Sequence, residues 1–414
     1  MEPDPSIDAA TSPFDRRVWR VVGDPLVRGA RTAVTALPLA GIAVAVKDLI
    51  AVAGQPVGAG NPAWLAEQQP QLRSAPALEA LLAAGADVVG IARTDEFAYS
   101  LAGTNVHYGT PPNPAAPGAI SGGSTSGPAS AVALGQAAVG LGTDTGGSIR
   151  IPASYQGLVG IRTSHGAIDT VGVLPLAPAF DTVGWLTRDT PTALRVAGVL
   201  LDGTEDRALD AARTVVLPAA QRCASPDVSL ACDVLRDRLA AGGVLPPVQD
   251  DDVPADVLQR WLAAFRTVQA YQAWTAHGAW VRTHPGALGD DIAERFAVAA
   301  QVTEAEAERA AGVAEQARAQ LQRLLANAVL VLPSSAGGAL PLHAAATEVE
   351  AERAGTLQLT CVAGLAGAPA VSVPVLQTSD GRPAGFCLVG APGTDRDLLR
   401  LAHRIALWSE TFSP

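Results

Sequence analysis

The chain contains 414 residues, of which 48% are hydrophobic and 17% are charged, and its formal net charge at pH 7 is −11. This composition excludes global disorder and supplies enough apolar residues for a large buried core. The acidic balance argues against nucleic-acid binding, which needs a basic surface to displace counterions.

Targeting signals and cysteines bear on the cellular compartment. Residues 1–15 are acidic and lack an apolar segment, so we expect no secretory signal. We also expect no membrane span, because no apolar run of about 18 residues is free of charge or of dilution by Gly and Ala. The four cysteines have no CxxC spacing and are too few for a disulfide framework. These features predict a protein of the reducing cytoplasm.

The first part of the chain alternates between strand and helix patterns. Residues 1–36 are rich in Pro, Asp and Arg and predict a loosely ordered lead-in with, at most, one short helix. Residues 37–414 are expected to form one domain, since no repeat or clear linker interrupts them. Within it, a strand over 42–48, a helix over 75–84 and a strand over 87–93 predict an α/β fold.

Residues 100–128 are rich in Gly, Ser, Thr, Asn and Pro and predict a long loop. Loops of that length in compact domains are usually functional. A helix of small residues over 128–138 and a glycine-rich turn over 140–148 should follow it. Further helices are expected over 189–202, 227–240, 254–274, 302–327 and from about 396, and further strands over 328–332, 370–375 and 385–389.

Lys47 is the only lysine of the chain, which contains 28 arginines. Arginine stays protonated in proteins, whereas a desolvated lysine can lose its proton and act as a base. Arginine is used at every other position where the chain has a Lys or Arg. A lone lysine in the apolar stretch GIAVAVKDLI therefore indicates a catalytic role. The alternative is a lysine that merely ends a strand, and its position alone does not separate the two interpretations.

Two segments rich in glycine and serine carry the strongest functional signal: GGSTSG at 122–127 and GTDTGGSIRIPAS at 142–154. Neither contains a P-loop, a dinucleotide fingerprint or a GxSxG nucleophile elbow. The histidines show no arrangement around them that a Ser-His-Asp triad would need. A neutral lysine is the next candidate base for a serine nucleophile. A flexible Gly/Ser linker is the alternative, and the apolar, periodic flanks argue against it.

The glycines before the second serine indicate a further element of such a site. They allow consecutive backbone N–H groups to point into one hollow, where an oxyanion would form during acyl transfer. The candidate donors are the N–H groups of Thr145, Gly146, Gly147 and Ser148.

With the GIAVAVKDLI strand before them, GGSTSGPASAVA and GTDTGGSIRIPAS resemble the amidase signature family, and the two serines are 24 positions apart, as in that family. The similarity extends over about 41–188 and returns in PAVSVPVLQTSDGRPAGFCLVG at 369–390. Within the family, stretches such as GNPAWL, DEFAYSLAGTNVHYGTPPNPAAP and FDTVGWLTRD are most similar to plant-type indole-3-acetamide hydrolases.

This resemblance implies a single large α/β domain with a mixed central β-sheet flanked by many helices. By position, Lys47 matches the family's base, Ser124 its bridging serine and Ser148 its acyl-forming nucleophile. The bridging serine of the family follows a cis peptide bond, which here would join Gly123 to Ser124. The four candidate amide donors match the family's oxyanion hole. No metal and no other cofactor is implied.

Further positions have weaker assignments. Asp144 and Arg150 also match the family and are expected to hold the loops in place. Phe97, Asn105 and Tyr108 are candidates for substrate contact because they are close in sequence to the first serine motif, although loop packing is the commoner role of such aromatic residues.

We therefore expect an amidohydrolase that cleaves a small-molecule carboxamide, such as an arylacetamide, through a Ser-Ser-Lys triad and an acyl-enzyme, releasing ammonia or an amine. Three alternatives remain: a hydrolase of ureido compounds such as biuret or allophanate, the glutaminase subunit of a tRNA amidotransferase, and a catalytically silent amidase-like scaffold. The scaffold is the least expected, because all three catalytic positions are kept. The expected partner is the small amide substrate, without nucleic acid or membrane, and a homodimer remains open.

Overall fold

The computed structural model describes residues 14–32, 36–202, 208–209, 211–251 and 253–411. Within these ranges one sheet of 11 strands runs through the molecule, in the order β1-β3-β2-β4-β6-β5-β10-β11-β9-β7-β8. The strands are β1 (Trp19–Val27), β2 (Ala43–Lys47), β3 (Asp87–Ala92), β4 (Val139–Asp144), β5 (Val159–Arg162), β6 (Thr182–Thr187), β7 (Arg213–Val216), β8 (Val248–Asp250), β9 (Ala328–Pro333), β10 (Ala370–Gln377) and β11 (Pro383–Val389).

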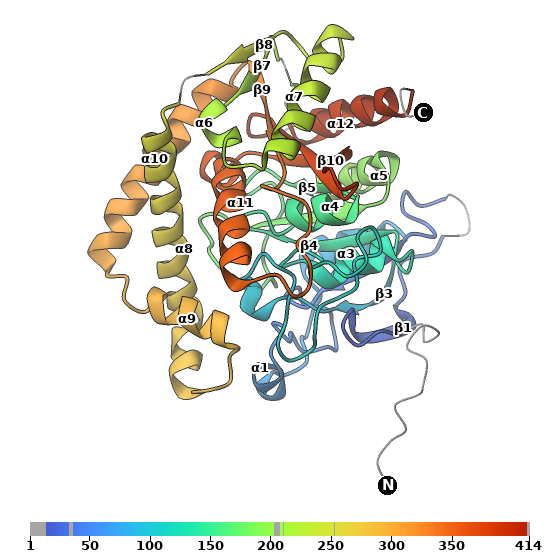
Figure 1. Cartoon of the computed structure of the whole chain (residues 1–414). Helices are drawn as coiled ribbons and strands as arrows, with labels where there is room; N and C mark the ends of the chain where they lie inside the picture. Colours follow the sequence, from blue (N-terminus) through green and yellow to red (C-terminus); the bar gives the residue numbers. More distant parts are fainter. Residues whose placement is uncertain (1–13, 33–35, 203–207, 210, 252, 412–414) are drawn as a thin grey trace.

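Helices lie on both faces of this sheet (Figure 1). They are α1 (Pro62–Glu67), α2 (Pro76–Ala83), α3 (Ser126–Ala133), α4 (Arg150–Gln156), α5 (Thr190–Leu200), α6 (Pro218–Gln221), α7 (Pro226–Ala241), α8 (Ala255–Thr283), α9 (Asp290–Ala299), α10 (Glu304–Leu325), α11 (Ala346–Ala366) and α12 (Asp395–Glu410). The pairs β2–β3, β2–β4, β7–β8 and β7–β9 are parallel, and the remaining neighbours are antiparallel. The predicted single α/β domain with a mixed central sheet is therefore confirmed.

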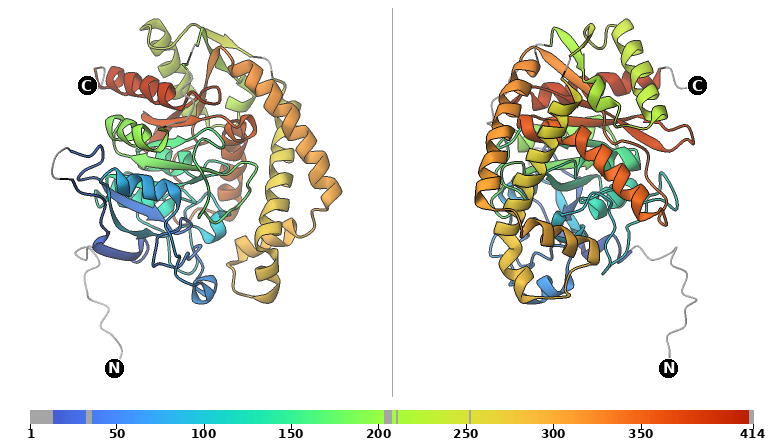
Figure 2. Two further views of the ribbon diagram at one scale, coloured as in Figure 1. Left: turned by 180° about the vertical axis from the view of Figure 1, so that it is seen from behind. Right: turned by 60° about the vertical axis from the view of Figure 1, so that its left-hand side comes forward.

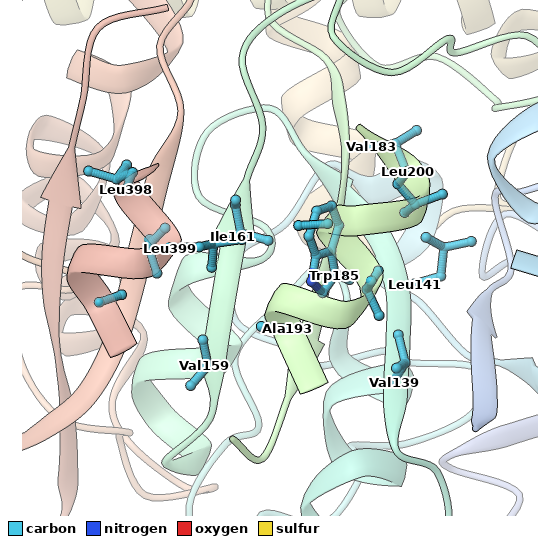
Figure 3. Packing of buried hydrophobic residues seen from close by; sticks show 14 of the residues in the cluster. Val139, Leu141, Val159, Ile161, Val183, Trp185, Ala193, Leu200, Leu398 and Leu399 are labelled. Carbon is cyan, nitrogen blue, oxygen red and sulfur yellow. The ribbon is translucent and has the colours of Figure 1, made fainter. Parts of the chain in front are cut away.

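The centre of the sheet buries alternate side chains on each face, as the two-residue period of a strand requires. Leu141 of β4, Ile161 of β5 and Trp185 of β6 are fully buried on the face that α5 and α12 cover (Figure 3). Figure 2 shows α5 and α12 next to each other when the molecule is seen from behind. The strands that carry the site are thus fixed by a continuous apolar core.

The opposite face is covered by α3 and α4, with α11 beyond them, and α8 and α10 lie side by side outside α11 (Figure 1). Gly142 of β4 shows why small residues are needed here, because an added Cβ would lie 2.3 Å from Thr125 Cγ2 at the start of α3. The glycine-rich turn predicted over 140–148 is accordingly a strand up to Asp144, and the turn itself comes only after it. Glycine in this strand permits close packing of a helix.

Strand β1 departs from the loosely ordered lead-in expected over 1–36. Residues 19–27 pair antiparallel with β3 at the edge of the sheet, so the domain begins before residue 37. The strand contains Pro25 and its register shifts twice, which hides the apolar alternation that would mark a strand in sequence. Residues 1–13, also part of that prediction, lie outside the described residues.

The helices predicted over 189–202, 227–240, 254–274 and 302–327 are confirmed as α5, α7, α8 and α10, and α8 continues to Thr283. Helix α11 was not predicted from the sequence. Its second half is buried on all sides, so the helical alternation of apolar and polar residues is lost. Among the helices of the described ranges, none combines the length and apolarity needed to cross a bilayer.

Candidate active site

Lys47 is the last residue of β2, the strand that lies between β3 and β4, and its side chain is completely buried. Burial lowers the pKa of Lys47 to about 7, although nearby carboxylates, chiefly that of Asp95, act in the opposite direction. Burial disfavours the charged form of an amine because the ion loses its hydration. A substantial share of Lys47 is therefore neutral near pH 7 and available as a base.

Three hydroxyl groups surround the Lys47 amine. Its Nζ lies 2.8 Å from Ser124 Oγ, 2.9 Å from Thr143 Oγ1 and 3.0 Å from Thr125 Oγ1. Thr125 Oγ1 donates its own hydrogen to the Thr143 carbonyl at 3.2 Å, so towards Lys47 it acts as an acceptor. A neutral amine has two hydrogens and one lone pair. In the structure Nζ donates to all three hydroxyl oxygens, so in the neutral form one of these three contacts is made by the lone pair instead.

Ser124 connects this amine to Ser148. Ser124 Oγ donates to Ser148 Oγ at 3.1 Å, and both side chains are buried. The peptide bond between Gly123 and Ser124 is cis, and the Ser124 carbonyl accepts a hydrogen bond from Thr94 Oγ1 at 2.8 Å. The three side chains thus form a continuous chain of hydrogen bonds between strand β2 and the turns that precede α3 and α4.

The turn before α4 presents backbone amides next to Ser148. Within the described residues, the N–H groups of Thr145, Gly146 and Ser148 make no hydrogen bond, as free oxyanion donors would require. The Gly147 N–H instead donates to Asp144 Oδ1 at 3.0 Å. Gly147 has φ = 120°, a conformation that glycine adopts readily. Three of the four predicted donors remain free, and the fourth orders the turn.

Asp144 is the centre of a buried ion network beneath this turn. Its carboxylate accepts from Arg150 Nη2 at 2.8 Å and from Arg162 Nη1 at 3.2 Å. Burial alone would raise the pKa of Asp144, but the two guanidinium groups hold it well below its usual range. Arg150 also donates to the carbonyl of Thr360 in α11, so the network links the turn to a helix on the outer layer. This is the loop-holding position predicted for Asp144 and Arg150.

Asp95 is a site residue that the sequence reasoning missed. It follows β3, and its carboxylate accepts hydrogen bonds from Gly103 N at 3.0 Å and Ser126 Oγ at 3.1 Å. Burial raises the pKa of Asp95 to about 6. The signal was available, since β2 and β3 are predicted strands of one sheet and residues just after parallel neighbours meet at the same edge. Thr125 and Thr143, which accept hydrogen bonds from Lys47 alongside Ser124, were also missed.

Two adjoining cavities lead to Ser148. The inner one measures about 10 Å³, enough for one small polar group, and is lined by Ser148, Thr145 and Gly146 among others. The outer one measures about 810 Å³. Both share one set of lining residues: Tyr99, Ser100, Leu101, Gln269, Arg295 and Arg353. A small molecule can therefore occupy the outer cavity while one of its groups reaches Ser148.

The three residues suggested for substrate contact lie elsewhere. None of Phe97, Asn105 and Tyr108 lines either cavity. Phe97 packs in an aromatic cluster with Trp64 and Phe296. Asn105 Nδ2 donates to two backbone carbonyls, those of Gly60 and Thr94. Tyr108 lies under the guanidinium of an arginine. All three therefore have structural contacts, which the sequence could not distinguish from ligand contacts.

Within the described residues, no group of three or more His, Cys, Asp or Glu side chains is arranged to hold a metal ion.

Comparisons with known proteins agree with this geometry. A model of the amidase family matches residues 27–228. The chain is 34% identical over 404 residues to Amidase 1 of Arabidopsis thaliana, covering 89% of this chain and 93% of the relative, and 35% identical over 395 residues to Amidase 1 of Oryza sativa subsp. japonica, covering 89% and 91%. A crystal structure of an amidase superimposes with a TM-score of 0.82 at 27% identity, covering 95% of this chain and 92% of that one.

Proposed function

This chain belongs to the amidase family and is a hydrolase of amide C–N bonds, and on that premise we propose that Ser148, Ser124 and Lys47 carry out the reaction on a small-molecule carboxamide. One observation carries the proposal: Lys47 Nζ lies 2.8 Å from Ser124 Oγ, which lies 3.1 Å from Ser148 Oγ. That is hydrogen-bond reach for both proton transfers.

In the first half-reaction, neutral Lys47 takes a proton from Ser124, and Ser124 takes one from Ser148 as Ser148 Oγ attacks the amide carbon. For this step the hydroxyl hydrogens rotate, so that each serine donates toward the lysine. The oxyanion forms against the free N–H groups of the turn. Removing one such donor typically costs about 3–4 kcal/mol of transition-state stabilisation.

Collapse of the tetrahedral intermediate breaks the C–N bond, and the proton returns through Ser124 to the leaving nitrogen. Ammonia or an amine departs and Ser148 holds the acyl group as an ester. Water then enters, loses its proton through the same chain, and attacks the ester carbon. The acid is released and Ser148 regains its hydrogen.

Labelling with a fluorophosphonate probe and ammonia release from a panel of amides test this assignment. The wild-type protein should be labelled at Ser148 and should release ammonia. The Ser148→Ala variant should do neither, while keeping the wild-type melting temperature. Ammonia release at an undiminished rate by the Ser148→Ala variant would contradict Ser148 as the nucleophile. A wild-type protein that is neither labelled nor active would favour a silent scaffold.

We propose that the protein is located in the cytoplasm, and the state of its cysteines supports this. All four are free thiols in the structure, which suits a reducing compartment. Fractionation of cells that express a tagged chain, followed by immunoblotting, tests the location. Recovery of the tagged chain with organelles or membranes would contradict it.

A further inference from the structure

Three arginines from three different helices line the outer cavity: Arg266 of α8, Arg295 of α9 and Arg353 of α11. Two of them, Arg295 and Arg353, also line the inner cavity beside Ser148. Among the described residues lining that inner cavity, these two are the charged side chains and no carboxylate accompanies them. The charged side chains that line the cavity next to the proposed nucleophile are therefore both cations.

The acidic residues of the outer cavity do not cancel this charge. Asp291 lies 3.8 Å from Arg295, and Glu350 lies 3.3 Å from Arg353, but their side chains are 50% and 60% exposed, against 20% and 19% for the arginines. Ion pairs with such exposed partners are weak because water screens them. The acids therefore mark the solvent end of the cavity and the guanidinium groups its inner end.

Two more carboxylates border the outer cavity. Glu294 is exposed to solvent. Glu352 accepts hydrogen bonds from Tyr155 Oη at 3.0 Å and from Thr356 Oγ1 at 3.1 Å, and burial raises its pKa. These bonds, and one from Gly337 N–H at 2.8 Å, all go to Oε1 of Glu352. Within the described residues, neither Glu294 nor Glu352 forms an ion pair with the arginine cluster.

The arginine cluster has hydrogen-bond donors that the protein does not use. Within the described part of the chain, Arg266 makes no hydrogen bond or ion pair, and its buried Nε and Nη2 have no partner. Arg353 Nε is likewise buried without a partner. Burial, and after it the charge of Arg353, lowers the pKa of both Arg266 and Arg295. Like charges held close together around a cavity favour an anion there, and a carboxylate matches a guanidinium in geometry.

We infer that the substrate is an amide that also carries a carboxylate, bound with its amide at Ser148 and its carboxylate at Arg353 and Arg266. This inference rests on the proposed function and narrows the substrate from carboxamides in general to the monoamides of short dicarboxylic acids and ureido acids of similar length. The inner cavity, with its volume of about 10 Å³, has room for about one water-sized group and so takes one polar atom of the amide, while the remainder of the molecule extends toward the arginines of the outer cavity. A neutral arylacetamide would bring no negative charge to these cations.

The test compares kcat/KM for matched substrates. Dicarboxylic acid monoamides with one to four methylene groups are assayed beside neutral amides of the same length, such as pentanamide for glutaramate, and beside phenylacetamide and a ureido acid. The wild-type enzyme should prefer the best anionic amide over its neutral match by at least about tenfold, mainly through a lower KM. The ureido acid is included because it carries the same carboxylate as the monoamides. Comparing its kcat/KM with theirs shows which of the two classes of compound the enzyme prefers.

Arg353→Gln and Arg266→Gln should each reduce that preference at least about tenfold, with the loss in KM and not in kcat. Arg260→Gln is the matched control, since Arg260 also lies on α8 but its side chain is 65% exposed and borders neither cavity. It should leave the preference unchanged. If the wild-type enzyme favours neutral amides, or if both cavity variants keep the preference, the carboxylate site is disproved while amide hydrolysis stands.

A binding measurement keeps the inference testable without turnover. Titration calorimetry on the Ser148→Ala variant with glutarate, the dicarboxylate product of glutaramate, should give binding that the neutral pentanamide does not match and that the additional Arg353→Gln substitution removes. Equal affinity for glutarate and pentanamide would overturn the anion site. Absence of both ammonia release and labelling of Ser148, with glutarate binding retained, would instead contradict the proposed function and leave the anion site intact.

Discussion

Thr143 Oγ1 lies 2.9 Å from Lys47 Nζ, although 96 positions separate the two residues in sequence. They are on neighbouring parallel strands, β4 and β2, which bring their side chains to the same edge of the sheet. Thr143 and Thr125 each accept a hydrogen bond from the amine, so once Lys47 is neutral, with two hydrogens, they leave its lone pair for Ser124. The orientation of the proposed base therefore depends on residues that take no part in proton transfer.

Replacing Thr143 with valine should test this orienting role. The amine loses one acceptor, and we expect kcat/KM for amide hydrolysis to fall about tenfold, together with about 1–3 kcal/mol of unfolding free energy from the unsatisfied group. Steady-state kinetics and urea denaturation measure the two effects. Thr214→Val is the control, because Thr214 is also buried with a backbone partner but lies on β7, away from the site. If both substitutions lower the unfolding free energy equally and Thr143→Val leaves kcat/KM unchanged, Thr143 does not orient the amine.

Replacing Lys47 should separate charge from basicity. Lys47→Arg keeps a cation but supplies no base, and Lys47→Met keeps an apolar chain of similar length. General-base catalysis is worth about 10²–10⁴-fold, so both variants should lose at least that factor in kcat for ammonia release. Circular dichroism of Lys47→Met should show a folded protein, since an uncharged side chain suits the buried position. Near wild-type turnover by either variant would exclude Lys47 as the base.

The pH dependence of hydrolysis follows from the lowered pKa of Lys47, about 7. The active form is the neutral amine, whose fraction falls as the pH drops below the pKa. We expect kcat/KM to rise with pH, to reach half its plateau near pH 7, and to be about tenfold below the plateau at pH 6. Stopped assays in buffers of constant ionic strength measure the profile. A half-maximum near pH 10, the ordinary range of lysine, would show that burial does not set the ionisation.

Asp144→Asn should mainly destabilise the fold. The substitution leaves Arg150 and Arg162 buried without their counter-charge, and breaking a buried pair in this way costs about 3–5 kcal/mol. Chemical denaturation measures the loss. Asp256→Asn, which breaks an exposed pair with Arg260, serves for comparison and should cost about 0.5 kcal/mol or less. Equal costs for the two substitutions would contradict the importance of the buried network.

Gly142→Ala should lower stability and activity together. The new Cβ would lie 2.3 Å from Thr125 Cγ2 and would displace a hydroxyl that contacts Lys47. Overpacking of this kind typically costs about 1–3 kcal/mol. Gly198→Ala in α5 is the control, because nothing lies within 4 Å of its added Cβ, and it should stabilise the helix by about 0.5–1 kcal/mol. Thermal melts and ammonia-release assays of the two variants make the comparison.

The sequence by itself determined the features that depend on residue type and short spacing. A single lysine among 28 arginines indicated a base, two Gly/Ser segments indicated a serine nucleophile with amide donors beside it, and alternating strand and helix patterns indicated an α/β fold. Each of these signals lies within one segment of chain. The strands and helices with clear apolar periodicity were placed to within a few residues for the same reason.

Only the tertiary structure decided which groups meet. Thr143 and Asp95 contact the site because β2, β3 and β4 are neighbours in the sheet, and that pairing is fixed by packing on both faces. Gly147 turned out to use its amide for Asp144, an interaction no spacing reveals. The arginines of the cavity come from α8, α9 and α11, where each looks like any helical cation. Contacts between segments far apart in the chain arise from the burial of apolar surface by the whole fold, which no local pattern encodes.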